Sequence, residues 1–81
     1  MIEIKVLGSG CANCKKVEAL AHQAVDELGL EARFEKVTDT NQIMSYDILS
    51  TPGLVVNGKV VSYGRIPRVE EIKGWLKEAQ G

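Results

Sequence analysis

Two cysteines stand three residues apart where a strand-like segment is followed by a helix-like one, and this junction limits the folds open to the chain. The segment 2–7 is rich in β-branched residues, Gly8-Ser9-Gly10 interrupts it, and apolar residues recur at helical spacing from about Ala12. Cys11 then lies at or just before a helix start, where unpaired N–H groups and the helix dipole favour a thiolate. Cys14 lies one turn further in, so both sulfurs fall on one helical face, close enough to form a small disulfide.

The rest of the chain alternates between strand-like and helix-like segments. Asn57-Gly58 between two apolar runs predicts a β-hairpin with a type I′ turn. A right-handed crossover makes the first two strands parallel, so the order β-α-β-α-β-β-α predicts an α/β fold with a four-stranded mixed sheet flanked by three helices. The predicted segments after the first strand are a helix over about 12–28, a strand over about 31–37, a short helix after the cap candidates 38–41, strands on either side of 57–58, and a last helix from 67 or 68.

Composition indicates one small domain. The 81 residues form a single domain, 1–81, near the lower size limit for folding without a disulfide or metal. The formal net charge is −1 with no basic stripe, so we expect no nucleic-acid partner. No apolar run approaches the ~20 residues that cross a bilayer, and no signal-peptide pattern opens the chain. We therefore expect a soluble cytoplasmic protein without a membrane partner, in which a disulfide is more often catalytic or sensing than structural.

Other uses of the two cysteines remain open at this point. They could be small buried hydrophobes, since free cysteine packs well. A structural zinc site needs about four ligands, and two cysteines with the single histidine, His22, do not complete one. A carrier that binds the soft ion Cu(I) through the same C-x-x-C is a sharper alternative, although such proteins usually have Met before the motif and end on a strand. A redox-sensing or partner-binding module without turnover is a third.

Several motifs occur together in an order that points to one family. They are Gly8-Ser9-Gly10-Cys11-Ala12-Asn13-Cys14, Thr51-Pro52-Gly53, Gly64, and Glu70-Glu71-Ile72. The combination covers essentially the whole chain and resembles the thioredoxin superfamily, in particular its minimal, small redox-active disulfide proteins of archaea and bacteria. Three differences stand out. Thioredoxins proper have Trp before the first cysteine and Gly-Pro between the pair, they are longer than this chain, and they have a buried acid where this chain has Lys5.

The resemblance implies a thioredoxin-like fold and a protein dithiol-disulfide oxidoreductase. Cys11 is then the attacking thiolate and Cys14 the resolving thiol, and the pair forms the redox disulfide. The chain has no flavin or nicotinamide fingerprint, so no cofactor and no metal are expected. A separate disulfide reductase would supply electrons, protein disulfides would be the substrates, and the protein would act as a monomer.

The same resemblance assigns a substrate-binding role to three residues far from the cysteines in sequence. It implies a cis Thr51–Pro52 bond beside the disulfide, with the main chain of Thr51 free to pair with an extended peptide. Gly64, after the fourth strand, either keeps the substrate groove open or is an ordinary glycine at a strand end.

Four other side chains have both a structural and a functional interpretation. Lys15 is either a solvated helix residue or a group that favours the thiolate, and Lys5 is either exposed at a sheet edge or a charge below the disulfide. His22 lies about 16 Å along the helix from Cys11, at 1.5 Å rise per residue, and we expect it to be solvated. Trp75 is expected to pack on the last helix.

Overall fold

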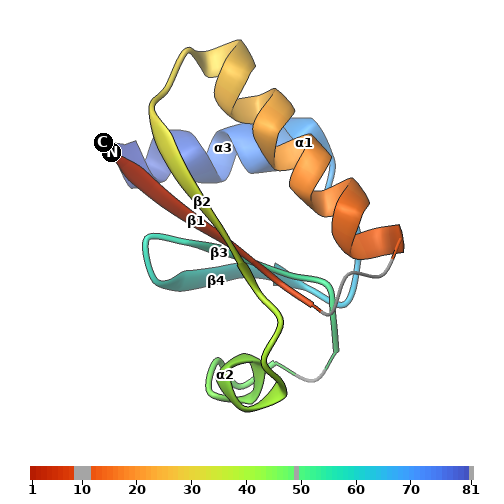
Figure 1. Cartoon of the computed structure of the whole chain (residues 1–81). Helices are drawn as coiled ribbons and strands as arrows, with labels where there is room; N and C mark the ends of the chain where they lie inside the picture. Colours follow the sequence, from red (N-terminus) through yellow and green to blue (C-terminus); the bar gives the residue numbers. More distant parts are fainter. Residues whose placement is uncertain (9–11, 49, 81) are drawn as a thin grey trace.

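The computed structural model of this chain describes residues 1–8, 12–48 and 50–80. A four-stranded mixed sheet has α1 and α3 on one face and α2 on the other (Figure 1). This is the predicted thioredoxin-like α/β architecture, in the predicted order. The strands are β1 (Ile2–Leu7), β2 (Ala32–Val37), β3 (Gly53–Val56) and β4 (Lys59–Tyr63), and the helices are α1 (Ala12–Leu28), α2 (Thr40–Met44) and α3 (Val69–Gln80).

The sheet has the strand order β2-β1-β3-β4, which makes β1 a central strand. It runs parallel to β2 and antiparallel to β3, and β3 is antiparallel to β4. At the end of β1, Leu7 pairs with Val37 on one side and with Gly53 on the other. The end of β1, the end of β2 and the start of β3 therefore lie at the same end of the sheet.

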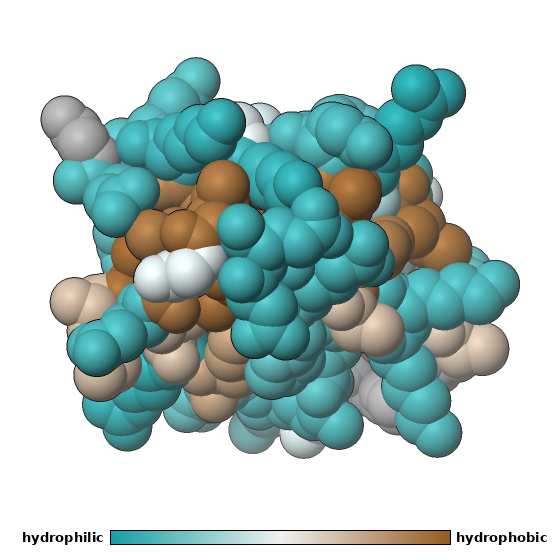
Figure 2. All heavy atoms as spheres, turned by 90° about the horizontal axis from the view of Figure 1, so that it is seen from above, coloured by the Kyte–Doolittle hydropathy of each residue, from teal (hydrophilic) through white to brown (hydrophobic). Residues whose placement is uncertain are grey.

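The apolar core has a larger and a smaller part, on opposite faces of the sheet. Side chains alternate between the faces of a strand, so Ile4 and Val6 pack toward α1 and α3, together with the fully buried Ile72 and Leu76 of α3. On the other face, Leu7, Val37 and Val55 pack against residues in and after α2. Seen from above, on the side of α1 and α3, the surface is mostly hydrophilic, with hydrophobic residues visible between the hydrophilic ones (Figure 2).

The hairpin between β3 and β4 is tied to the start of β1. Asn57 and Gly58 have φ values of 50° and 82°, the left-handed pair that a type I′ turn requires. The backbone N–H of Asn57 donates to the Glu3 carbonyl at 2.8 Å, and the Asn57 side-chain oxygen accepts from the Glu3 N–H at 2.9 Å. The predicted turn is confirmed, and its Asn also anchors a third strand.

The hairpin contains one irregularity that the sequence does not predict. Val55 pairs with Val60, whereas the preceding residue, Leu54, pairs with Ser62. Val61 is thus an extra residue in β4, a β-bulge that bends the strand and increases its twist.

The start of α3 uses a carboxylate three residues inside the helix instead of an N-terminal Ser, Thr or Asp. The Glu71 carboxylate accepts from the backbone N–H of Arg68 at 3.2 Å and from the Arg65 guanidinium at 2.7 and 3.1 Å. The hydrogen bond with Arg65, and then that with the Arg68 backbone, lower the pKa of Glu71 to about 2. This reciprocal half of a capping box starts the helix at Val69, one or two residues after the predicted position.

Among the described residues, no helix combines the length and the apolar character that crossing a membrane requires.

Candidate functional site

Cys14 lies in the first turn of α1, on the side facing the sheet. The helix begins at Ala12, and only 4% of Cys14 is exposed. No cysteine in the described part of the chain is a free thiol. The predicted roles of Cys11 lie outside the described residues and stay predictions.

Gly8 allows two other segments to approach the Cys14 sulfur. A Cβ atom at position 8 would overlap Cys14 Sγ and would lie 3.7 Å from Cβ of Thr51. Three separate parts of the chain therefore meet here: the end of β1, the first turn of α1 and the loop that enters β3. Only a residue without a side chain fits between them.

The loop before β3 has the geometry expected for it. The Thr51–Pro52 peptide bond is cis, Thr51 is exposed and Pro52 is buried. The carbonyl of Pro52 accepts from the Gly64 N–H at 2.9 Å. Gly64 has a φ of 74°, a left-handed conformation that favours glycine, and a Cβ there would displace the hydroxyl of Ser50.

The structure thus brings four of the five predicted site residues to one end of the sheet. Cys14 lies next to Gly8, Gly8 lies next to Thr51, and Pro52 is bonded to Gly64. The arrangement places a buried sulfur near the exposed residue Thr51.

The charged residues near the motif divide between the two faces of the sheet. Lys5 is on a central strand, so its interpretation as an edge residue is wrong. Its Nζ lies 3.5 Å from the Tyr46 hydroxyl and 3.6 Å from carboxylates of Glu3 and Glu35. The hydrogen bond with Tyr46 is the main cause that raises the pKa of Lys5, and the two carboxylates add to it. Lys5 therefore lies on the α2 face, opposite Val6, which lines the cavity beside Cys14.

His22 and Trp75 occupy the positions expected of residues outside the site. His22 is exposed and stacks on Phe34, with ring centroids 3.7 Å apart. Trp75 is half-buried and packs against the core on the α3 side. Lys15, by contrast, is exposed and also lines the cavity beside Cys14, so both of its interpretations stay open.

Three residues at the site were not singled out from the sequence. The sequence indicates Gly8 only as part of the chain break and of the family motif, whereas its missing side chain makes room for the Cys14 sulfur. Glu18 and Lys36 line the cavity next to Cys14. Glu18 could have been found, because a residue four positions after Cys14 lies on the same face of a helix. Lys36 could not, because its proximity depends on strand register.

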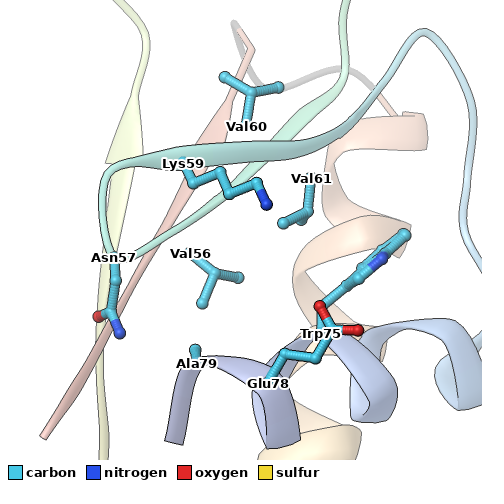
Figure 3. A pocket seen from close by; sticks show the side chains of 8 residues that line it. All are labelled: Val56, Asn57, Lys59, Val60, Val61, Trp75, Glu78 and Ala79. Atoms are coloured by element: carbon cyan, nitrogen blue, oxygen red, sulfur yellow. The ribbon is translucent and has the colours of Figure 1, made fainter. Parts of the chain in front are cut away.

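A cavity of about 510 Å³ lies at the other end of β3, and the hairpin and the last turns of α3 form its walls (Figure 3). It is lined by Val56, Asn57, Lys59, Val60, Val61, Trp75, Glu78 and Ala79. No thiol lies among these residues, and Val56 is at the opposite end of β3 from Gly53, so this cavity is not the site of the cysteine chemistry.

Within the described ranges, no group of three or more His, Cys, Asp and Glu side chains is arranged to hold a metal ion.

Comparison with known proteins gives consistent results at the level of sequence and of fold. A family model described as a thioredoxin domain matches residues 2–77. Thioredoxin from Methanothermobacter thermautotrophicus is 44% identical over 73 residues, which cover 90% of this chain and 95% of that protein. Thioredoxin from Methanocaldococcus jannaschii is 42% identical over 77 residues, 95% of this chain and 88% of that one. A solved structure described as that of a malarial protein has a TM-score of 0.71 at 10% identity, covering 100% of this chain and 99% of its own, and is similar in fold alone.

Proposed function

Because this chain belongs to the thioredoxin domain family, a family of thiol-disulfide oxidoreductases, we propose that it exchanges a Cys11–Cys14 dithiol/disulfide pair with disulfides of other proteins. The observation that carries the proposal is the close approach of Cys14 and Thr51 to Gly8. It sets a buried sulfur, suited to resolve rather than to attack, close to the exposed residue Thr51.

The exchange proceeds in two balanced steps. The Cys11 thiolate attacks one sulfur of the substrate disulfide, forming a mixed disulfide and releasing the other substrate sulfur as a thiolate. Cys14, after losing its proton, attacks the Cys11 sulfur and releases the second substrate thiolate. The substrate disulfide gains two electrons, and the Cys11–Cys14 pair is left oxidised. A separate reductase returns the pair to the dithiol.

The substrate would lie along Thr51, Pro52 and Gly64. Thr51 is exposed, and Pro52 has no N–H group to compete for an incoming peptide. Gly64 presents no side chain on the other side of this loop, and its own N–H is already occupied by the Pro52 carbonyl. A peptide pairing with the Thr51 main chain would be held as an added strand.

Alkylation followed by mass measurement tests the exchange. Wild-type protein should take up no thiol reagent when oxidised and two equivalents after reduction. Cys14→Ser should accumulate stable mixed disulfides with protein substrates, whereas the matched variant Cys11→Ser should trap few, because the attacking group is missing.

Two outcomes would contradict the proposal. If oxidation yields only intermolecular dimers, the pair does not work as an intramolecular redox couple. If the reduced protein instead binds one equivalent of Cu(I) tightly against competing small thiols and exchanges no disulfide, the soft-metal carrier is the correct function.

A further inference from the structure

The cavity between the β3–β4 hairpin and the last turns of α3 has the size of a small-molecule site. Its volume of about 510 Å³ falls within the roughly 300–1,000 Å³ that is typical of ligand pockets. On the helix side, Ala79 lies four residues after Trp75, so a small side chain follows the indole on one helical face. On the hairpin side, β4 bends at the bulge formed by Val61. Space is therefore left between the helix and the hairpin.

The inner wall of this cavity is apolar. Val56 is buried, and Val61 and Trp75 are half-buried. All three belong to the larger part of the core, and all three also line the cavity (Figure 3). They can therefore take the apolar body of a ligand out of water, and that transfer favours binding.

Two opposite charges border the apolar wall from different elements. Lys59 comes from β4 and Glu78 from α3, and both exposed side chains line the cavity (Figure 3). In the part of the chain that the structure describes, neither forms an ion pair, with the other or with a third residue. Glu78 also lies three residues after Trp75, on the same helical face. The cavity thus has a cationic wall and an anionic wall, each without a protein partner.

Asn57 adds a hydrogen-bond donor on the hairpin side. Its side-chain oxygen accepts from the Glu3 N–H, so the NH2 group is the part of the amide that can donate to a ligand. The ammonium of Lys59, with this amide, therefore favours a carboxylate at the hairpin wall. The carboxylate of Glu78, with the indole of Trp75, favours an ammonium at the helix wall.

We propose that this cavity binds a small zwitterionic ligand with an apolar body, its carboxylate at Lys59 and its ammonium at Glu78. A ligand with a single charge would pair with one wall and leave the charge on the other wall without a partner. Free leucine and leucylleucine are simple ligands of this chemistry, one an amino acid and the other a short peptide. The cavity lies at the opposite end of β3 from Gly53, so the inference does not depend on the exchange function.

Tryptophan fluorescence tests the inference directly, because Trp75 is the only tryptophan of the chain. Titration of the protein with L-leucine or leucylleucine should give a saturable change in emission. Glycine, a zwitterion without an apolar body, should give none at the same concentrations. The N-acetyl forms lack the ammonium and the amide forms lack the carboxylate. Each should bind about three- to fivefold more weakly than the zwitterion, in the upper range for an exposed ion pair.

Two variants assign the charges to the two ends of the ligand. Lys59→Gln should bind the zwitterion and its amide form equally, because the partner of the carboxylate is gone. Glu78→Gln should bind the zwitterion and its N-acetyl form equally, because the partner of the ammonium is gone. The matched control is Lys77→Gln, a change in the last turns of α3 at an exposed residue that does not line the cavity. It should keep the wild-type affinities.

The outcomes separate the two sources of the ligand and also the inference from its failure. A saturable response to leucine alone would support an amino-acid site, and one to leucylleucine alone would support a peptide site. The absence of a saturable response to both, or equal affinities for the zwitterion and its singly charged forms, would overturn the inference. Wild-type selectivity in both Lys59→Gln and Glu78→Gln would overturn it as well.

Discussion

At the scale of single residues, the site depends on Gly8 having no Cβ atom. Gly8 connects β1 to the motif, and its lack of a Cβ permits the end of β1, the first turn of α1 and Thr51 to approach one another. A larger residue there could only be accommodated by moving Cys14 or the loop before β3. The position of the buried sulfur therefore depends on a residue outside the C-x-x-C.

Gly8→Ala should destabilise the protein and disturb the chemistry together. Overpacking of this kind costs about 1–3 kcal/mol in free energy of unfolding, and the displaced Cys14 should resolve mixed disulfides more slowly. Denaturant unfolding measures the first effect, and the rate at which a mixed disulfide between Cys11 and an aromatic disulfide reagent is resolved measures the second. Gly74→Ala is the matched control: nothing lies within 4 Å of its added Cβ. Since Gly74 lies inside α3, that change should instead stabilise by about 0.5–1 kcal/mol. Equal effects of the two substitutions would contradict the steric argument.

At the scale of the element, α3 is started by side chains that bridge its first turn and the preceding loop. Glu71 binds the Arg68 backbone and the Arg65 guanidinium at once. A carboxylate near a helix N-terminus also interacts favourably with the helix dipole. The low pKa of Glu71 means that these interactions favour its charged form, so they depend on pH.

Glu71→Gln should lower the unfolding temperature at neutral pH and lose this effect in acid. The folded pKa of about 2 lies below the ordinary value of 4.5, so the stabilisation is complete above about pH 5 and disappears as the pH falls toward 2. Thermal unfolding from pH 7 to pH 2 should show the wild-type and variant curves converging. Glu70→Gln, a change in the same turn, serves as control, and a gap between wild type and Glu71→Gln that persists at pH 2 would contradict the assignment.

At the scale of the whole molecule, stability rests on apolar contacts between α1, α3 and the sheet. A chain of 81 residues has a free energy of unfolding on the order of 4–12 kcal/mol. The core of Ile4, Val17, Ile72 and Leu76 is fully or almost fully buried. The ion pair between Glu27 and Lys73 also joins α1 to α3, but both side chains are partly exposed.

Ile72→Ala and Lys73→Met, neighbours in α3, should therefore differ strongly. Truncation of the fully buried isoleucine should cost about 2–5 kcal/mol, a large share of the total. Loss of the lysine charge should cost no more than about 1 kcal/mol, as for other surface pairs. Urea unfolding of the two variants provides the comparison, and a larger loss in Lys73→Met would show that the ion pair, not the core, joins the helices.

Much of this architecture follows from local signals in the sequence. The span of α1 at 12–28 and the turn at Asn57-Gly58 were predicted because helical periodicity, a terminal Gly29 and left-handed turn residues act over a few residues. The grouping of Thr51, Pro52 and Gly64 around the motif came from resemblance to a family rather than from periodicity.

What escaped prediction depends on contacts between distant segments. The start of α3 at Val69 depends on a carboxylate reaching back to Arg68, and the position of Lys5 depends on β1 being a central strand. Glu18 and Lys36 meet only because β2 pairs with β1 in one register. No local pattern contains that information.

The β-bulge at Val61 affects the tendency of β4, an edge strand, to pair with other chains and aggregate. An outermost strand presents unpaired N–H and C=O groups that can template the addition of another chain, the first step of cross-β aggregation. In β4 that row is short and broken by the bulge, with the exposed Lys59 at its start. At the opposite border, β2 carries the exposed Arg33 and Glu35. Each edge strand of the sheet is therefore a poor template for pairing with a strand of another chain.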